Sequence, residues 1–445
     1  MHKRRTARHT RQNLPQTPIE LDVTGLSIEG RGVARHDGKT VFVRGALPGE
    51  SVSARLEKRH SRYDEATLIE CFTTSPDRIK PACRHYQECG GCDLQHLDLD
   101  KQLGFKESAV LDQLSRFASV TPTQVEAPIK SATAGYRRSA RIGINQLQRD
   151  GSLIIGFRRR NSNKLTRIEH CMVLDPRADQ LFSVLYRELE HFSDLKLLTH
   201  LDITLGDDSG ALTFRATRQP SDELIEALKR VANTLSLQLY LELNDHQLTS
   251  IGSTPHLTYK LPDADITLQF EPDDFLQVNS EVNRRMVSQA LEWLSPKATD
   301  KVLDLYCGLG NFTLALAKQA GQVTGVEGSM KMVERAQGNA ALNHCDNTSF
   351  HCADLSQDCS ATAWMRQKYD LILLDPPRSG AAELARSLSK TGARSILYIA
   401  CNPSVLVRDS ATLTSQGYRM TRFCVLDMFP QTSHVESMAL FEKKR

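Results

Sequence analysis

The stretch that decides the fold of the C-terminal half is KVLDLYCGLGNF, residues 301–312. An apolar strand runs here into Gly308 and Gly310, which let the backbone turn tightly and approach a ligand at the strand's carboxyl end. A dinucleotide-binding fingerprint would continue with a third glycine at position 313, where this chain has threonine. The next predicted strand ends in Glu327, about where an acidic residue holds ribose hydroxyls in this architecture. The pattern therefore indicates an adenosine ligand without a pyrophosphate, which suits S-adenosylmethionine.

Strands and helices alternate on both sides of this stretch, from about Pro272 to the C-terminus. This run of βα units predicts a Rossmann-like α/β domain with helices on both faces of a parallel sheet. The last two strands, YRMTRFCVLDMF and SMALFEKK, have no long helix between them, which predicts an antiparallel edge hairpin. Asp354, at the end of the third strand, would accept a hydrogen bond from the adenine amino group or cap the next helix.

A cysteine, Cys401, stands at the end of the fifth predicted strand. Asn402 is a good helix N-cap and Pro403 suits the first helical position, so the thiol would lie beside the positive end of a helix dipole. That position lowers a thiol pKa and favours the thiolate. A lone cysteine is more often a small buried hydrophobe. This one, however, follows Asp375-Pro-Pro-Arg378 by one βα unit, at the edge where such sheets bind ligands, so we interpret it as a nucleophile.

A thiolate at this edge suits methyl transfer to carbon 5 of a uracil. That carbon is a poor nucleophile until a thiolate adds to carbon 6 and converts the ring into an enolate. A base must then remove the hydrogen on carbon 5 so that the thiol can leave. Glu436 is the expected base, because a partly desolvated carboxylate can be tuned for proton abstraction, and His434 is the reserve. Arg378 stands where amino-group methyltransferases often carry a base-stacking aromatic residue, which argues against an exocyclic amine as acceptor.

The N-terminal half is organised differently. Short predicted strands with turn signals at Asp37-Gly38 and Leu47-Pro48-Gly49 indicate a small β-barrel, either a nucleic-acid platform or a packing module. Beyond it, helices mix with mostly antiparallel strands, which indicates an α+β domain. The expected order is a basic arm at 1–14, a β-barrel at 15–73, a central α+β domain at 74–95 and 125–271, a helix at 96–124 that packs on the catalytic domain, and the methyltransferase domain at 272–445.

Eleven cysteines are present, and the N-terminal segment MHKRRTARHTRQ is basic without the apolar core of a secretory signal. We therefore expect a cytoplasmic protein whose cysteines are buried thiols, nucleophiles or metal ligands. Cys83, Cys89 and Cys92 are spaced C-x5-C-x2-C, and Cys171 follows much later. Four thiolates can hold either zinc or an iron–sulfur cluster. Zinc sites more often come as two close pairs, so the three-plus-one spacing favours a cluster.

The formal net charge of +3 is too small to identify a partner, so the distribution of charge matters more. Arg158–Arg160 form one basic cluster, and five lysines and arginines within the first 11 residues form another. Such clusters attract polyphosphate backbones or are simply solvated. Arg137, Arg138 and Arg141 could also hold phosphates around a target uridine, which must be single-stranded or flipped out. No run of about 18 apolar residues is present, so we expect no membrane span, and we expect a monomer.

Together these motifs resemble the bacterial RNA uridine-5-methyltransferase family, and within it the branch that acts on 23S ribosomal RNA. The resemblance is carried by Phe275–Asn279, Asp304–Phe312, Asp375–Arg378, Ala400–Ser404 and His434–Ser437. It implies Cys401 as nucleophile, Glu436 as base, and an OB-like TRAM barrel that binds RNA. It implies contacts to S-adenosylmethionine from Gln277, Tyr306, Asn311, Glu327, Asp354 and Asp375. It also implies a [4Fe–4S] cluster on Cys83, Cys89, Cys92 and Cys171.

Three other interpretations stay open. A transfer-RNA uridine-5-methyltransferase is the nearest. The added barrel and the cysteine cluster count against it, but only through analogy with the family. An amino-group methyltransferase would need no thiolate at position 401. A non-catalytic RNA-binding assembly factor with a vestigial cofactor fold is the alternative from another class.

Overall fold

The computed structural model describes residues 17–244, 247–253 and 255–444, so the predicted basic arm at 1–14 lies outside the described residues. The chain forms two compact units. The first contains the N-terminal residues up to Ala82, with 92–105 and 431–433, and the second contains 83–91, 106–430 and 434–445. The five-part division made from the sequence stays a prediction.

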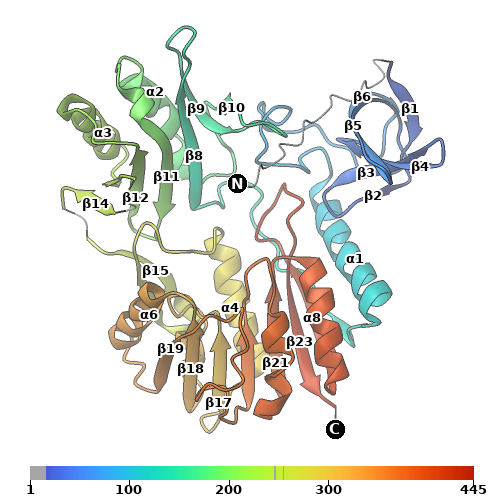
Figure 1. The fold of residues 1–445 in the computed structure, drawn as a ribbon, viewed down its shortest axis with the longest axis vertical. Coiled ribbons are helices and arrows are strands. Elements are labelled where there is room, and N and C mark those ends of the chain that lie inside the picture. Colours follow the sequence, from blue (N-terminus) through green and yellow to red (C-terminus); the bar gives the residue numbers. More distant parts are fainter. Residues whose placement is uncertain (1–16, 245–246, 254, 445) are drawn as a thin grey trace, which may run out of the picture. The chain divides into compact units, whose positions relative to one another are not determined.

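The first unit is built on a six-stranded sheet that curls around an apolar core (Figure 1), in the order β1-β5-β6-β4-β3-β2. Asp37 and Gly38 join β3 to β4 with positive φ angles of 48° and 77°, so the Asp-Gly turn signal is confirmed. The strands are β1 (Ile19–Asp22), β2 (Gly25–Leu26), β3 (Arg31–His36), β4 (Lys39–Arg44), β5 (Ser51–Arg59) and β6 (Tyr63–Thr73).

A buried ion pair fixes the chain where it leaves this barrel. Glu50 is 1% exposed, and its two carboxylate oxygens accept hydrogen bonds from Arg78 Nε at 2.6 Å and Nη2 at 2.8 Å. The same carboxylate accepts the backbone N–H of Leu47 at 2.8 Å. A two-point pair of this kind is geometrically specific, so it sets the conformation of the Leu47-Pro48-Gly49 turn.

A seven-stranded sheet forms the central part of the second unit, in the order β10-β9-β8-β11-β12-β13-β14. Adjacent strands in this sheet are antiparallel, except that β12 and β13 are parallel. The prediction of mostly antiparallel pairing is therefore confirmed. One face packs against α2 and α3 around a core of leucine, isoleucine and valine side chains. The elements are β8 (Ser139–Gln146), β9 (Leu153–Arg158), β10 (Leu165–Arg167), α2 (Leu181–Leu189), β11 (Leu198–Leu205), β12 (Gly210–Ala216), α3 (Asp222–Thr234), β13 (Gln238–Glu242) and β14 (Leu248–Ile251).

An eight-stranded sheet forms the C-terminal part, in the order β19-β18-β17-β20-β21-β23-β22-β7. The first five of these strands are parallel, as the βα pattern predicts, and Figure 1 shows several of them as neighbouring arrows. β23 is antiparallel to both β21 and β22, so the predicted hairpin forms. The strands are β17 (Lys301–Leu305), β18 (Gln322–Glu327), β19 (Thr348–Cys352), β20 (Leu371–Leu374), β21 (Ser395–Ala400), β22 (Tyr418–Leu426), β23 (Glu436–Lys443) and β7 (Gln124–Val125).

Helices connect these strands, and a short hairpin precedes them in the chain. Their buried leucine, valine and alanine side chains join the large core under the sheet. The elements are β15 (Leu257–Leu261), β16 (Ile266–Phe270), α4 (Ser280–Leu294), α5 (Thr313–Ala317), α6 (Met330–Leu342), α7 (Ala382–Ala385) and α8 (Pro403–Ser415).

The predicted helix near residue 100 is α1 (Leu99–Ala118). It carries Lys106, which is fully buried and donates to Asp427 Oδ1 at 3.2 Å and to the Phe429 carbonyl at 3.1 Å. Burial lowers the pKa of Lys106 and raises that of Asp427, while each charge opposes the shift of the other. The pair therefore joins the helix to the chain immediately after β22.

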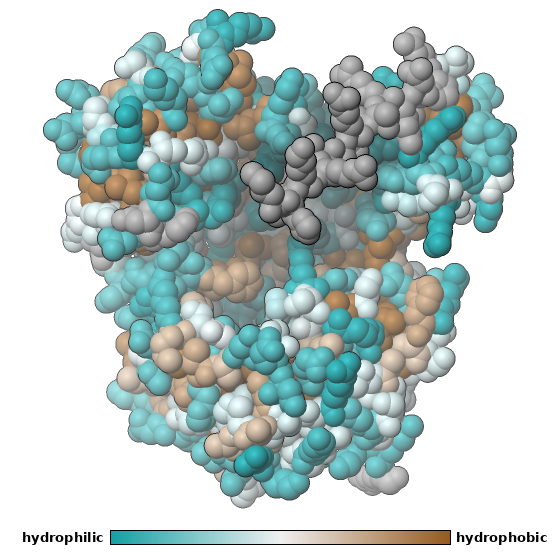
Figure 2. All heavy atoms as spheres, viewed as in Figure 1, coloured by the Kyte–Doolittle hydropathy of each residue, from teal (hydrophilic) through white to brown (hydrophobic). Residues whose placement is uncertain are grey.

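Hydrophilic side chains dominate the face drawn in Figure 2. Among the residues that the structure describes, no helix combines the length and the hydropathy needed to cross a lipid bilayer.

Replacing Lys106 by methionine should lower the free energy of unfolding of the second unit by about 3 kcal/mol, because Asp427 loses its partner while staying buried. Urea unfolding followed by tryptophan fluorescence measures this, since both tryptophans, Trp293 and Trp364, belong to that unit. The control is Lys101→Met on the same helix, whose ion pair with Asp77 is exposed and worth about 0–1 kcal/mol. Equal, small effects of the two substitutions would contradict a structural role for the buried pair.

Candidate functional site

The loop after β17 brings the predicted glycines and the acidic residue of β18 together. Tyr306, Gly308 and Gly310 all have positive φ angles, of 64°, 55° and 97°. The backbone N–H of Gly308 donates to Glu327 Oε2 at 3.2 Å, and Glu327 Oε1 accepts the N–H of Gly328 at 2.7 Å. A Cβ built on Gly308 would find only the tip of Met332, 4.0 Å away, so space is open above this part of the loop. The Glu327 carboxylate is thus oriented at the carboxyl end of its strand, beside that space.

Asn311 and Gln277 are held by side-chain hydrogen bonds from different elements. Asn311 exchanges two amide hydrogen bonds with Asn283 of α4, both at 3.0 Å, and accepts the Tyr259 hydroxyl at 2.9 Å. Gln277 Nε2 donates to Asp375 Oδ2 at 3.2 Å. Burial raises the pKa of Asp375 to about 7, while the bond from Gln277 opposes the shift. The structure therefore links Gln277 directly to the double-proline turn.

Asp354 follows the end of β19, the strand beside β18. Its carboxylate is exposed and accepts the Ser356 hydroxyl at 2.6 Å and the Ser356 N–H at 3.0 Å, and these bonds lower its pKa. The segment that follows is a turn, so the predicted alternative of a helix cap is wrong. The Tyr306 hydroxyl donates to the Leu355 carbonyl at 3.3 Å, and the charges of Asp354 and Glu327 are among those that add to burial in raising the Tyr306 pKa to about 12.

Cys401 and Glu436 face each other through the pairing of β21 with β23. Ala400 pairs with Ser437 in the antiparallel register, so the next step along each strand places Cys401 opposite Glu436. Glu436 is 3% exposed, and burial, followed by the charge of Asp375, raises its pKa to about 8. His434, the reserve base, is exposed and its ring rests edge-on against Phe429. The geometry places Glu436, not His434, beside the thiol.

The predicted helix start after Cys401 is confirmed. Asn402 caps α8 by accepting the Ser404 N–H at 3.1 Å, Pro403 opens the helix, and Asn402 Nδ2 donates to the Arg378 carbonyl at 3.1 Å. The prediction of a lowered thiol pKa is wrong. Burial, followed by the charges of Glu436 and Asp375, raises the pKa of the Cys401 thiol to about 11, against the opposing charge of Arg378. Two carboxylates and desolvation outweigh the helix end, so the thiol is protonated at neutral pH.

Two further groups of this part of the chain are buried: Asp304, which was given no role from the sequence, and Arg138, which was predicted to be exposed to RNA. Asp304 is fully buried beneath the loop and accepts the Thr313 hydroxyl at 2.5 Å, and burial raises its pKa to about 7. Arg138, predicted to hold phosphates, is only 2% exposed, and its Nε donates to the Gln277 carbonyl at 2.8 Å. Its Nη1 and Nη2 have no hydrogen-bond partner among the described residues. The alternation of buried Tyr136, Arg138 and Ala140 along the chain is the signal that would have placed Arg138 inside.

The other predicted phosphate-binding arginines are largely engaged within the protein. Arg141 makes a two-point ion pair with Asp202, at 2.8 and 3.0 Å. Arg159 pairs with Glu88 at 3.3 Å, and Arg160 lies over the Tyr86 ring, 4.9 Å from its centroid. The last two hold the segment that contains Cys83 and Cys89, so they serve the fold whether or not they also contact RNA.

That segment lies against the turn between β9 and β10. Gly90 N–H donates to the Arg158 carbonyl at 2.9 Å, and a Cβ at Gly90 would stand 3.0 Å from the same oxygen, so a larger residue would crowd this contact. Cys83, Cys89 and Cys171 are half-buried. Burial, with smaller contributions from Cys89 and Cys83, raises the pKa of Cys171 to about 11.

Within the described ranges, no three histidine, cysteine, aspartate or glutamate side chains converge closely enough to form a closed metal site. Cys92 belongs to the first compact unit and the other three cysteines to the second.

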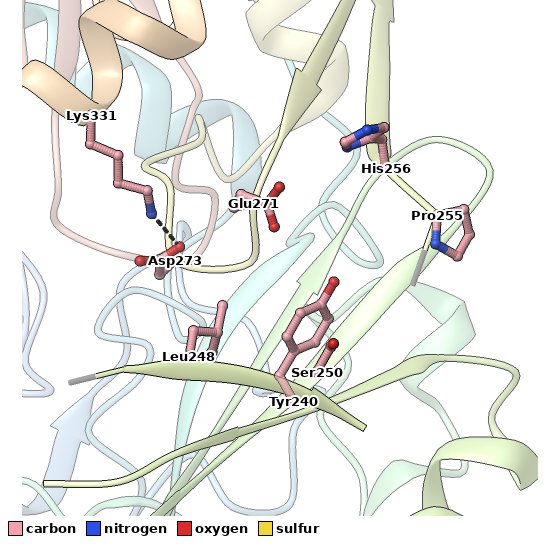
Figure 3. Close-up of a pocket in the computed structure, with 8 residues that line it drawn as sticks. All are labelled: Tyr240, Leu248, Ser250, Pro255, His256, Glu271, Asp273 and Lys331. Carbon is pink, nitrogen blue, oxygen red and sulfur yellow. Dashed lines mark hydrogen bonds and ion pairs between the residues drawn. The ribbon is translucent and has the colours of Figure 1, made fainter. Parts of the chain in front are cut away.

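A cavity of about 620 Å³ lies elsewhere in the second unit, between β13, β14 and the start of α6. Figure 3 shows the Lys331 ammonium directed at Asp273, at 2.6 Å, with Glu271 nearby. Its lining contains none of the predicted site residues, so the cavity is separate from Cys401. The lining residues are Tyr240, Leu248, Ser250, Pro255, His256, Glu271, Asp273 and Lys331.

Comparisons with known proteins cover nearly the whole chain. The family model described as tRNA (Uracil-5-)-methyltransferase matches residues 99–444, and that of the TRAM domain matches residues 17–69. The 23S rRNA (uracil(1939)-C(5))-methyltransferase RlmD of Hahella chejuensis is 44% identical, over 97% of this chain and 99% of its own. The protein of the same name from Alkalilimnicola ehrlichii is 42% identical, over 98% of each chain.

Among solved structures, the Pyrococcus abyssi tRNA (uracil-54, C5)-methyltransferase in complex with S-adenosyl-L-homocysteine superposes with a TM-score of 0.75. The match covers 95% of this chain and 100% of that one at 23% identity, so it shows a shared fold.

Alkylation of Cys401 by iodoacetamide should respond in opposite directions to two substitutions. Glu436→Gln removes a negative charge and should lower the thiol pKa, which raises the rate at pH 9, whereas Arg378→Gln should lower the rate. One unit of pKa changes the thiolate fraction about tenfold while the thiolate is the minor form. Mass spectrometry of the Cys401 peptide measures the rate, with exposed Cys352 as internal control. Rates that move together in the two variants would contradict the charge assignment.

Proposed function

The chain belongs to the RNA uracil-5-methyltransferase family, and from this premise we propose that it transfers a methyl group from S-adenosylmethionine to carbon 5 of a uridine in 23S rRNA. The names of the two relatives, at 44% and 42% identity over nearly their full length, support ribosomal RNA over transfer RNA. The family's TRAM domain at residues 17–69 supports RNA as the partner.

The observation that carries the chemistry is the buried Glu436 opposite Cys401 at the carboxyl end of β21. A non-catalytic assembly factor would have no use for this pair, because an acid kept in the interior with a pKa of about 8 costs stability. An amino-group methyltransferase would need neither residue. The pair therefore favours the covalent route to carbon 5.

S-adenosylmethionine, when bound, supplies the methyl group from a positively charged sulfonium. The residues that would hold it line the carboxyl edge of the parallel strands and the open space above Gly308, where the Glu327 carboxylate is already oriented. They are Gln277, Tyr306, Asn311, Glu327, Asp354 and Asp375.

Cys401 attacks carbon 6 of the uracil, and the ring electrons move onto the carbonyl oxygen to give an enolate. Because the thiol pKa is about 11, the proton passes from sulfur to solvent water as the sulfur–carbon bond forms, and the Arg378 charge favours that loss. After carbon 5 has gained the methyl group, Glu436 removes the hydrogen from that carbon. The carbon–carbon double bond re-forms and expels the Cys401 thiolate.

The proposal includes a [4Fe–4S] cluster, whose ligands would be Cys83, Cys89, Cys92 and Cys171. The charges of Cys89 and Cys83 add to burial in raising the pKa of Cys171, which supports the nearness of these three sulfurs, and a cation bound there would favour their thiolate forms. Backbone N–H groups support it, since Gly91 donates to Cys89 Sγ at 3.4 Å. The cluster would hold the segment in place, and no step of the methyl transfer uses it.

RNA containing 5-fluorouridine should become covalently attached to Cys401, because fluorine cannot leave as the proton does. A 23S rRNA fragment that includes the uracil named for the relatives should give a complex stable to denaturing gel electrophoresis. Cys401→Ala should abolish the complex, and Cys352→Ala should leave it intact. Preferential trapping of a transfer RNA would overturn the ribosomal assignment, and trapping by Cys401→Ala would overturn the nucleophile.

The rate of product release should rise with pH through about 8, because the base must be ionised and burial raises the pKa of Glu436 to that value. Single-turnover methylation of the rRNA fragment between pH 6.5 and 9.5 measures the profile. The Glu436→Gln variant should accumulate the methylated covalent adduct even with RNA that contains no 5-fluorouridine. A profile that is flat across this range, or an adduct that fails to accumulate, would remove Glu436 from the role of base.

A further inference from the structure

The cavity of about 620 Å³ in the second unit has the size of a ligand site, since pockets that bind small molecules run from about 300 to 1,000 Å³. Its walls come from segments far apart in the chain: β13, β14, the residues just before β15, the turn after β16 and the first turn of α6 (Figure 3). No step of the proposed methyl transfer uses any of its side chains. The cavity is therefore available for another ligand.

The charges around this cavity favour a ligand that donates hydrogen bonds. Among the described residues that line it, Glu271 and Asp273 contribute two carboxylates and Lys331 a single ammonium. An excess of negative charge repels a phosphate, so the backbone of a nucleic acid is a poor occupant. A metal ion is also unsuited, because the described residues nowhere gather three histidine, cysteine, aspartate or glutamate side chains as ligands. What remains is a neutral group with N–H donors.

The Glu271 carboxylate is able to accept hydrogen bonds from such a group. Its ion pair with Arg335 is 3.5 Å long, beyond the range of about 2.7–3.2 Å for a good hydrogen bond, and 31% of its side chain is exposed. Asp273, by contrast, accepts a short hydrogen bond of 2.6 Å from Lys331. The cavity therefore offers a loosely held acceptor beside a donor and acceptor that are already paired.

The edge of an amino-bearing nucleobase matches this arrangement. Guanine, cytosine and adenine each place an amino group near a carbonyl oxygen or a ring nitrogen, so a carboxylate receives the amino hydrogens and an ammonium donates to the acceptor. Uracil has one N–H between two carbonyl oxygens and fits two carboxylates poorly. Tyr240, Leu248 and Pro255 add apolar walls, which suit the flat face of a base.

The cavity is also a close neighbour of the proposed methylation site along the chain. Asp273 precedes Gln277 by four residues, and Lys331 follows Glu327 by four. Four residues span at most about 14 Å, and both Gln277 and Glu327 are proposed to hold S-adenosylmethionine. A nucleotide a few positions from the target uridine is thus within reach of the cavity, and proteins read single-stranded RNA through bases that are splayed out in this way.

We propose that this cavity binds an unpaired, amino-bearing base of the RNA a few nucleotides from the target uridine, an inference that rests on the proposed function. Glu271 accepts a hydrogen bond from the amino group of that base, and Lys331 donates to the neighbouring oxygen or ring nitrogen. The cavity thereby contributes to the choice of RNA and takes no part in the transfer of the methyl group.

The test uses the full chain and a set of 23S rRNA fragments around the uracil named for the relatives. In each fragment one unpaired base loses its amino group, by inosine for guanosine, uridine for cytidine or purine riboside for adenosine. Filter binding gives the affinity for each fragment, and calorimetric titration gives the affinity for S-adenosylmethionine. The variant is Glu271→Gln. The matched control is Glu292→Gln, because Glu292 belongs to α4, is 75% exposed and does not line the cavity.

Glu271→Gln should weaken binding of the unsubstituted fragment, although it removes a negative charge that repels RNA, whereas Glu292→Gln should leave that binding unchanged or strengthen it. One of the base substitutions should weaken binding to the wild-type chain by about 5- to 150-fold, the usual range for one well-placed base contact. The same substitution should have little further effect on Glu271→Gln. The affinity for S-adenosylmethionine should be equal in all three proteins, which shows that the neighbouring site is intact.

Two results would overturn the inference and leave the proposed function standing. The first is an affinity of Glu271→Gln no lower than that of Glu292→Gln, or lowered equally for every fragment. The second is a loss that appears only when spermidine is present, which would make the occupant a polyamine. A wild-type chain that neither methylates nor traps the fragment would overturn the proposed function, and this inference with it.

Discussion

The antiparallel pairing of β23 with β21 is the constraint on which the site depends. In a purely parallel sheet every strand delivers its carboxyl end to the ligand edge. β23 runs the other way, so it delivers its first residue, Glu436, to the edge where β21 delivers Cys401. A slip of one residue would turn Glu436 to the opposite face and replace it by Val435 or Ser437. Register alone therefore decides whether the thiol has a carboxylate beside it.

The electrostatics of the site follow from the burial of several acids in a small volume. Asp304, Asp375 and Glu436 are enclosed, and burial raises their pKa values to about 7, 7 and 8. Carboxyl groups held in this way destabilise the fold. Two guanidinium nitrogens of Arg138 add to that cost, because the described residues offer them no hydrogen bond. Natural sequences accept such conflicts where a ligand or a reaction uses them. Glu436 and Asp375 both act on the Cys401 thiol, whereas Lys331 beside the separate cavity is paired with Asp273.

The sequence predicted the parts of this structure that depend on local pattern. The glycine turn after β17, the cap at Asn402, the Asp-Gly hairpin and the parallel order of the sheet each follow from residues close together in the chain. The roles of the site residues stay predictions, although Gln277, Asp375, Cys401 and Glu436 do come together. The thiol pKa could not be predicted, because it depends on two carboxylates from distant strands outweighing one helix end. The burial of Arg138 likewise depends on the elements that cover it.

Contacts from far along the chain hold the segment that precedes Glu436, the proposed base. Between β22 and β23 the backbone is irregular, and no ladder of strand hydrogen bonds fixes it. Lys106 binds Asp427 and the Phe429 carbonyl, and the Tyr136 hydroxyl donates to the Pro430 carbonyl at 3.0 Å. Both donors come from outside the region predicted to form the methyltransferase domain. Glu436 thus belongs to the C-terminal sheet, whereas Lys106 and Tyr136, which bind the segment before it, come from earlier in the chain. That dependence gives a physical reason for the C-terminal sheet and the preceding regions to be one continuous chain.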